Sequence, residues 1–94
     1  MVKVIVQHHT ADYDRWYQVY IEHGDVRRTH GAQGHTIYRG VEDPNNLFVV
    51  NSFASADGAQ SFMTDPSLKE AMGRAGVDSE PQIWVMNEAD SQDY

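Results

Sequence analysis

The order of strand-like and helix-like segments is the feature of this sequence that most constrains its fold. Residues 2–9 alternate in the strand sense, with Val2, Val4, Val6 and His8 on one face. Directly behind them, aromatic and apolar side chains recur three and four residues apart, as on one face of a helix. The members of this stripe are Tyr13, Trp16, Tyr17, Tyr20 and Ile21. The chain therefore begins with a strand followed by an amphipathic helix with an aromatic inner face.

A hairpin is predicted in the middle of the chain. Residues 35–39 and 47–53 are typical of strands, and the turn-forming residues 42–46 lie between them. Gly24 either ends the preceding helix or weakens it locally, and Gly31 is a second candidate end, because glycine commonly ends helices.

Two short helices and a last strand are predicted after the hairpin. Ser55 is a candidate N-cap for the first helix. Asp65 followed by Pro66 is typical of the start of the second, and Gly76 of its end. Residues 82–88 predict the final strand.

This order, β-α-β-β-α(α)-β, predicts an α+β, ferredoxin-like βαββαβ fold with a four-stranded antiparallel sheet and helices on one face. Right-handed crossovers place the first strand at the sheet centre. We expect a single domain over residues 1–90 and an acidic C-terminal tail over residues 91–94.

The face of the sheet without helices predicts self-association. If the alternation is taken literally, that face carries Ile5, Phe48, Val50, Ile83 and Val85. Such a face is too apolar for water, so a second copy of the chain should cover it. The expected partner is therefore the protein itself, in a homodimer formed through the open sheet face.

The whole chain resembles the dimeric α/β-barrel superfamily, which includes antibiotic biosynthesis monooxygenase-like proteins, small polyketide cyclases, EthD-like proteins and muconolactone isomerases. Residues 20–26 resemble the Tyr-x-x-His segment that ends the first helix of EthD-like members, and residues 34–39 resemble their second strand. Ala59 and Phe62, followed by residues 65–68, resemble the superfamily's helix pair.

The resemblance implies a dimeric α/β barrel with a hydrophobic pocket between sheet and helices. It also implies a cofactor-independent monooxygenase, cyclase or isomerase that acts on an aromatic or polyketide-like small molecule. In resembling isomerases, a histidine at the position of His23 takes part in catalysis. Haem-degrading relatives carry a haem-ligating histidine in the later helical region, whereas this sequence has no histidine after His35.

Composition excludes several classes of function. The chain has no cysteine, which removes thiol nucleophiles and thiolate metal sites. Its 14 acidic and 7 basic side chains give a net charge of -7, which argues against nucleic acid as a partner. The first apolar run is too short for a membrane span or signal-peptide core, so we expect a cytoplasmic protein with no membrane partner. Residues 31–34 contain glycines but no following helix, so no nucleotide cofactor is expected.

Two histidines are the candidate catalytic residues. His23 follows the aromatic stripe on the inner side of the first helix, where an imidazole can accept a proton near neutral pH. His8 shares a strand face with the core valines, so it is a second proton carrier, a hydrogen-bond donor to substrate or a structural histidine. No metal site is expected: His8 and His9 point apart, and His23, His30 and His35 match no metal-ligand spacing.

Five further residues are candidates for binding the hydrophobic substrate. Tyr17, Tyr20 and Trp84 could stack on a flat ring or simply pack in the core. Arg27 could hold an anionic group or pair with a surface carboxylate. Asn51 interrupts an apolar strand face, so it needs a partner from a ligand, the backbone or an ordered water.

Two alternatives to an enzyme remain open. A non-catalytic binding or accessory module would use the same aromatic pocket to retain a small molecule without converting it. A dimer with no small-molecule role would fill the space with Trp16, Tyr20 and Trp84 themselves.

Overall fold

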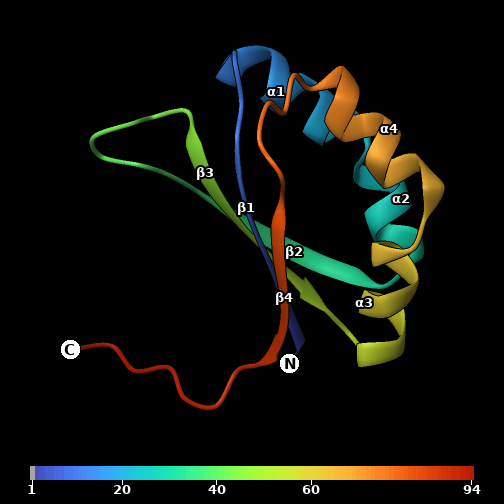
Figure 1. Ribbon diagram of the computed structural model, residues 1–94. Coiled ribbons are helices and arrows are strands. Elements are labelled where there is room, and N and C mark those ends of the chain that lie inside the picture. Colours follow the sequence, from blue (N-terminus) through green and yellow to red (C-terminus); the bar gives the residue numbers. More distant parts are fainter. Residues whose placement is uncertain (1) are drawn as a thin grey trace.

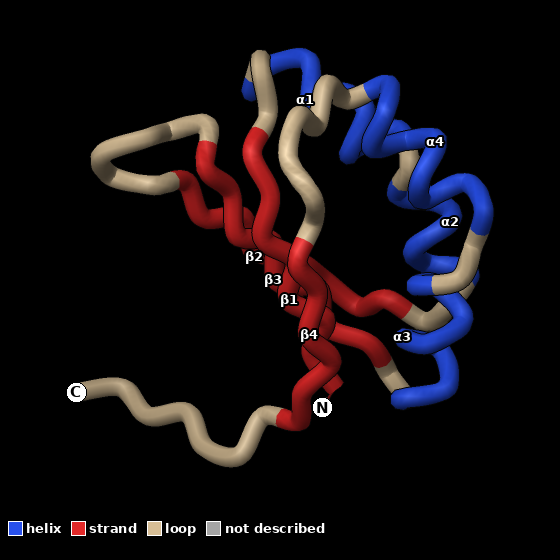
Figure 2. Tube along the Cα trace, viewed as in Figure 1, coloured by secondary structure: helices blue, strands red, loops and turns tan. Residues whose placement is uncertain are grey.

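The computed structural model describes residues 2–94 and consists of one sheet with helices on one of its faces (Figure 1). The strands lie in the order β2-β3-β1-β4 and are antiparallel, which confirms the predicted ferredoxin-like α+β fold with β1 inside the sheet. Figure 2 shows the sheet and the helices as two layers. The elements are β1 (Val2–His9), α1 (Tyr13–Glu22), α2 (Gly24–Thr29), β2 (Ala32–Arg39), β3 (Asn46–Phe53), α3 (Ala56–Met63), α4 (Pro66–Arg74) and β4 (Gln82–Asn87).

Both predicted glycine stops are used. The first helical region divides at His23, so that α1 ends there and α2 begins at Gly24. α2 ends before Gly31, which has φ +94°, a left-handed conformation that glycine adopts without steric cost. The sequence predicted one helix with two possible ends, and the structure has two helices joined at the candidate catalytic histidine.

The predicted caps fix the other helices. The Asp65 side chain accepts a hydrogen bond from the Ser67 N–H at 2.9 Å, and Ser55 accepts one from the Gly58 N–H at 3.0 Å. After α4, Gly76 has φ +76° and the Val77 N–H reaches back to the Met72 carbonyl at 3.2 Å, which is a Schellman ending.

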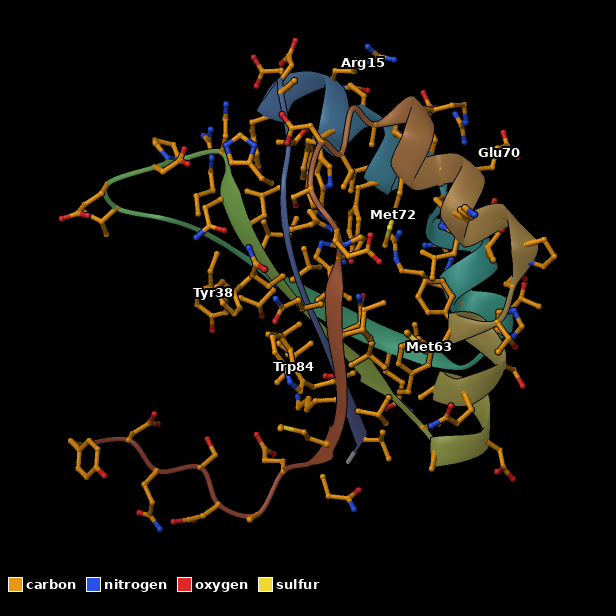
Figure 3. The ribbon with its side chains drawn as sticks, in the orientation of Figure 1. Arg15, Tyr38, Met63, Glu70, Met72 and Trp84 are labelled. Carbon is orange, nitrogen blue, oxygen red and sulfur yellow. The ribbon has the colours of Figure 1, made fainter. Side chains whose placement is uncertain are left out.

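The alternation assigned to β4 from the sequence is wrong by one residue. Val85 pairs with Val4 and Ile83 with Val6, so both face the helices. Trp84 instead pairs with Ile5 on the open face, away from the helices (Figure 3). Cross-strand partners share a face of the sheet, and a one-residue shift moves a whole strand's side chains to the other face.

The open face is nevertheless apolar and aromatic, as predicted. Phe48 is 41% exposed and Trp84 is 37% exposed, while Tyr38, which pairs with Phe48, is 58% exposed. Figure 3 shows Tyr38 and Trp84 on the same side of the sheet. The helix-covered face holds the core, with Val4, Leu47 and Phe53 inaccessible to solvent.

The end of α2 packs tightly against the start of α3, and this contact is testable. A Cβ on Gly58 would lie 2.2 Å from the His30 carbonyl oxygen, whereas a Cβ on Gly73 in α4 would meet nothing within 4 Å. We expect Gly58→Ala to lower the free energy of unfolding by about 1–3 kcal/mol through overpacking. Gly73→Ala should raise it by roughly 0.5–1 kcal/mol. Urea denaturation of both variants measures this, and equal effects would contradict the contact.

Residues 88–94 follow β4 without helix or strand and run away from the sheet (Figure 2). Within residues 2–94, no helix has the length and apolar character needed to cross a membrane.

Candidate functional site

A small, mostly apolar cavity lies between the helices and the sheet. Its volume is about 50 Å³, which is room for a few water molecules and about a third of the roughly 150 Å³ that holds benzene. Five of the seven predicted site residues line it. These are His8, His23, Arg27, Asn51 and Tyr20. Apolar side chains from α1, α3, α4 and the two central strands complete the lining: Val6, Trp16, Val19, Val49, Phe62, Leu68, Ala71, Met72 and Ala75.

The aromatic stripe of α1 forms one wall. Trp16 is 2% exposed and stacks on the Tyr20 ring with centroids 4.9 Å apart. The Tyr13 ring stacks on Trp16 as well, with centroids 5.8 Å apart, so that the three rings form a row. Helical spacing places these rings one turn apart, so the stacked row follows directly from the sequence.

His8 is a neutral imidazole whose N–H has no hydrogen-bond partner among the described residues. Its side chain is 3% exposed, and its Nε2 accepts a hydrogen bond from the Trp16 indole N–H at 2.8 Å. An indole nitrogen can only donate, so the His8 proton must be on Nδ1. Nδ1 is buried without a hydrogen-bond partner among the described residues. Burial lowers the pKa of His8 to about 4, which keeps the ring neutral at physiological pH.

His23 belongs to a hydrogen-bonded chain that ends on a carboxylate. Its Nε2 lies 2.8 Å from the Ser67 hydroxyl, and that hydroxyl donates to Asp65 Oδ1 at 2.7 Å. Because Ser67 uses its proton on Asp65, Nε2 is the protonated nitrogen of His23 and Nδ1 carries the free lone pair. The other carboxylate oxygen of Asp65 lies 2.9 Å from His30 Nε2.

These contacts set the protonation states of the chain. Hydrogen bonds from His30 and Ser67 lower the pKa of Asp65 to about 2, so it is a carboxylate at neutral pH. Burial and the nearby Arg27 charge lower the pKa of His23, which is 7% exposed. His23 is therefore neutral at pH 7 with an available lone pair, as a general base must be.

Arg27 and Asn51 are held by Tyr20. The Arg27 guanidinium lies over the Tyr20 ring, 3.6 Å from its centroid, and donates to the Tyr20 carbonyl at 2.8 Å. The Tyr20 hydroxyl donates to Asn51 Oδ1 at 2.8 Å. The sequence suggested a ligand, backbone or water partner for Asn51, and the structure supplies a tyrosine side chain from α1 instead.

Two predicted binding residues do not line the cavity. Tyr17 is 39% exposed on α1 and stacks on Tyr13 with centroids 6.0 Å apart. Trp84 lies on the opposite face of the sheet because of the β4 register. Neither side chain is placed to stack on a molecule in this cavity.

Sequence reasoning missed the part that Ser67 and Asp65 play at the site. Asp65 was recognised only as a helix cap, and the cap does form through the Ser67 N–H. The contact between His23 and Ser67 joins residues 44 positions apart, from the α1–α2 junction and the start of α4. Only the tertiary packing of the helices brings them together.

Among residues 2–94 there is no group of three or more His, Cys, Asp or Glu arranged to hold a metal ion.

Neither family models nor curated proteins match this sequence. Solved structures do match the fold. A candidate antibiotic biosynthesis monooxygenase from Bordetella bronchiseptica has a TM-score of 0.78 at 13% identity, over 94% of this chain and 96% of that one. SnoaB, a cofactor-independent oxygenase from Streptomyces nogalater, has a TM-score of 0.78 at 11% identity, over 96% and 94% of the two chains.

A third similar structure is that of Rv0793 from Mycobacterium tuberculosis, with a TM-score of 0.68, 13% identity and 98% of each chain covered. Identities this low show the shared architecture and leave the chemistry to be argued from the residues. The chain has the fold of antibiotic biosynthesis monooxygenase-like proteins.

Proposed function

We propose that the protein is a homodimeric, cofactor-independent enzyme that moves a proton on an aromatic or polyketide-like small molecule. The observation that carries this proposal is the convergence of His23 and His8 on one apolar cavity. His23 has a free lone pair and is backed by a carboxylate, and His8 has an N–H without a partner in the described part of the chain. A base and a hydrogen-bond donor in an apolar cavity are the groups that carbanion or phenolate chemistry needs.

In this proposal His23 Nδ1 removes an acidic C–H or O–H proton from the substrate. The imidazolium that forms keeps its Nε2–H on Ser67, and Ser67 keeps its hydrogen bond to the Asp65 carboxylate. The negative charge left on the substrate oxygen is stabilised by the His8 Nδ1–H, which is already neutral, buried and unpaired. His8 thus acts as a donor rather than as a second base, because Trp16 occupies its lone pair.

The substrate anion can then react in three ways. Protonation at another carbon gives isomerisation, and attack on an internal carbonyl gives cyclisation. With molecular oxygen as co-reactant, a methylene carbon is oxidised to a carbonyl and the second oxygen atom leaves as water. SnoaB is described as a cofactor-independent oxygenase of the same fold, which favours the oxygenation outcome.

Binding requires side chains to move. Arg27 and Asn51 line both the inner cavity of about 50 Å³ and an outer cleft of about 200 Å³. Together these spaces exceed the roughly 150 Å³ that holds a benzene ring. The inner cavity alone is too small for a fused aromatic substrate, so such a substrate must occupy both spaces. The side chains that line both spaces, Arg27 and Asn51, would have to move to admit it.

Anthrone, a tricyclic ketone with an acidic methylene, tests the proposal. Oxygen uptake and product mass are measured with the protein, with buffer and with heat-denatured protein. Protein-dependent oxygen consumption with a quinone product supports the enzyme. Stoichiometric retention of anthrone without product in air or under anaerobic conditions supports the binding-module alternative.

The homodimer is a separate prediction. We expect the wild-type chain to form dimers through the open face, because Phe48, Tyr38 and Trp84 expose aromatic surface there. Phe48→Lys places a charge in that face and should give monomers. Val41→Lys, in the fully exposed hairpin loop, is the matched control and should remain dimeric. Sedimentation velocity distinguishes the species, and a monomeric wild type at tens of micromolar would contradict the prediction.

A further inference from the structure

A second, more polar cleft lies directly outside the candidate site. Its volume is about 200 Å³, and it is bounded by α2 and by the start of β2. Its lining residues are Ile21, Gly24, Arg27, Arg28, Ala32, Gln33, Gly34, His35 and Asn51. Every ionisable side chain in this lining is basic, although the protein as a whole has a net charge of -7. Local charge of the sign opposite to the net charge indicates an anionic ligand.

Arg27 is the least compensated of these cations. It is 5% exposed, yet no described carboxylate lies within ion-pair distance of its guanidinium. Its contacts are the Tyr20 carbonyl and the Tyr20 ring, both of which are uncharged. Burial lowers the pKa of Arg27, which is the direction expected for a cation that lacks a counter-charge. A buried charge without a partner is costly, so an anion in the cleft would be favoured.

A second arginine approaches the same point. A Cβ placed on Gly24 would lie 3.2 Å from an Arg28 guanidinium nitrogen and 3.4 Å from one of Arg27. Both guanidinium groups therefore lie close to the same backbone position. Arg28 is paired with Asp25, which is 90% exposed, so this carboxylate offsets the outer arginine and leaves the buried one without a carboxylate partner among residues 2–94. Two guanidinium groups beside one open space can hold a planar carboxylate through several N–H donors.

The position of Arg27 connects this cleft to the chemistry. Arg27 and Asn51 line both spaces, so a molecule bound against Arg27 can extend past Asn51 towards His23. We propose that the outer cleft binds the carboxylate of an aromatic acid, with Arg27 as its counter-charge and the ring directed into the inner cavity. This inference rests on the proposed function and names its substrate class: an aromatic molecule that bears a carboxylate several atoms from the acidic hydrogen.

The test uses 2-naphthoate and its uncharged analogue 2-naphthamide, which have the same ring system. Calorimetry with the wild-type protein should show 2-naphthoate binding roughly ten- to hundredfold more tightly than 2-naphthamide, as expected for a charge-assisted hydrogen bond. Arg27→Gln should remove this preference. Arg15→Gln, on the exposed part of α1, changes the net charge equally and should keep it. Equal affinities for the two probes, or no binding of either, would overturn the proposal.

Arg27 also supports Tyr20, so the folding of the Gln variant is checked by circular dichroism. If it does not fold, the comparison of the two probes on the wild-type protein still tests the preference for a carboxylate. Arg27→Lys, which keeps the positive charge, should keep that preference. An NMR titration of the wild-type protein adds a direct reading. 2-Naphthoate should shift the Arg27 Nε–H resonance at lower concentration than the Nε–H resonance of Arg39, which lies over the Tyr13 ring and serves as the reference. Anthrone carries no carboxylate, so turnover of anthrone without naphthoate preference would refute this inference alone.

Discussion

Replacing His23 by alanine is expected to lower kcat/KM by about 100- to 10,000-fold, the usual contribution of a positioned general base. The reason is the geometry of the site. His23 is the cavity histidine whose ring keeps a free lone pair, since Trp16 occupies the lone pair of His8. The protein should remain folded, because among the residues that the structure describes the side chain replaced forms a hydrogen bond only with Ser67. Turnover of anthrone, followed by oxygen uptake and product absorbance, measures the change.

Two further variants separate a catalytic role from a structural one. His9→Gln changes a histidine that is bound to Asp43 and Asp78 and is not part of the cavity lining, and it should leave turnover unchanged. Ser67→Ala removes the acceptor of the His23 Nε2–H, so the imidazolium loses support and the apparent pKa in the pH–rate profile should fall. Turnover in His23→Ala equal to wild type would refute the assigned role.

Acidification is expected to destabilise the protein strongly through His8. The pKa of His8 is about 4 in the folded protein and 6.5 in the unfolded chain, so the unfolded state binds more protons between these values. The contribution of His8 is fully present above pH 6.5 and is lost as pH falls to 4, which amounts to about 3 kcal/mol. Asp65 stays ionised over this window, because its pKa is about 2.

Denaturation at several pH values between 4 and 7 measures this effect. His8→Phe should be less stable than wild type at pH 7, because the Trp16 N–H loses its acceptor, but its stability should depend less on pH. His9 is the matched control. Hydrogen bonding to Asp78 raises the pKa of His9, so its contribution is lost as pH rises, and His9→Gln should steepen the acid loss. A His8 variant with the wild-type pH dependence would contradict the assignment.

The fold was predictable because local patterns and tertiary structure agree along most of the chain. The alternation of residues 2–9 places Val4 and Val6 in the core, and the caps at Ser55 and Asp65 form as expected. β4 was misassigned because a short, continuously apolar strand does not reveal which residues face the helices. Only its pairing with β1, in which Trp84 meets Ile5, settles the register.

Most of the residues that line the candidate site were predictable, but Ser67 and Asp65 were not, nor were the roles of the individual residues. His8 and His23 could be named because they continue apolar faces of a strand and a helix. Which nitrogen each ring has available depends on Trp16 and on Ser67, and the Ser67 contact joins distant parts of the chain. Likewise, Arg27 was a candidate anion binder, but its lack of a carboxylate partner became visible only once Asp25 was found against Arg28.

Hydrogen exchange at the acidic methylene of anthrone tests the central claim, proton removal by His23, most directly. In deuterium oxide without oxygen, proton transfer alone replaces the methylene hydrogens, and NMR follows the loss of their signal. The account predicts exchange faster than in buffer with the wild-type protein and with His9→Gln, and exchange at the buffer rate with His23→Ala. Wild-type protein that exchanges no faster than buffer, or a His23→Ala variant that exchanges as fast as wild type, would contradict it.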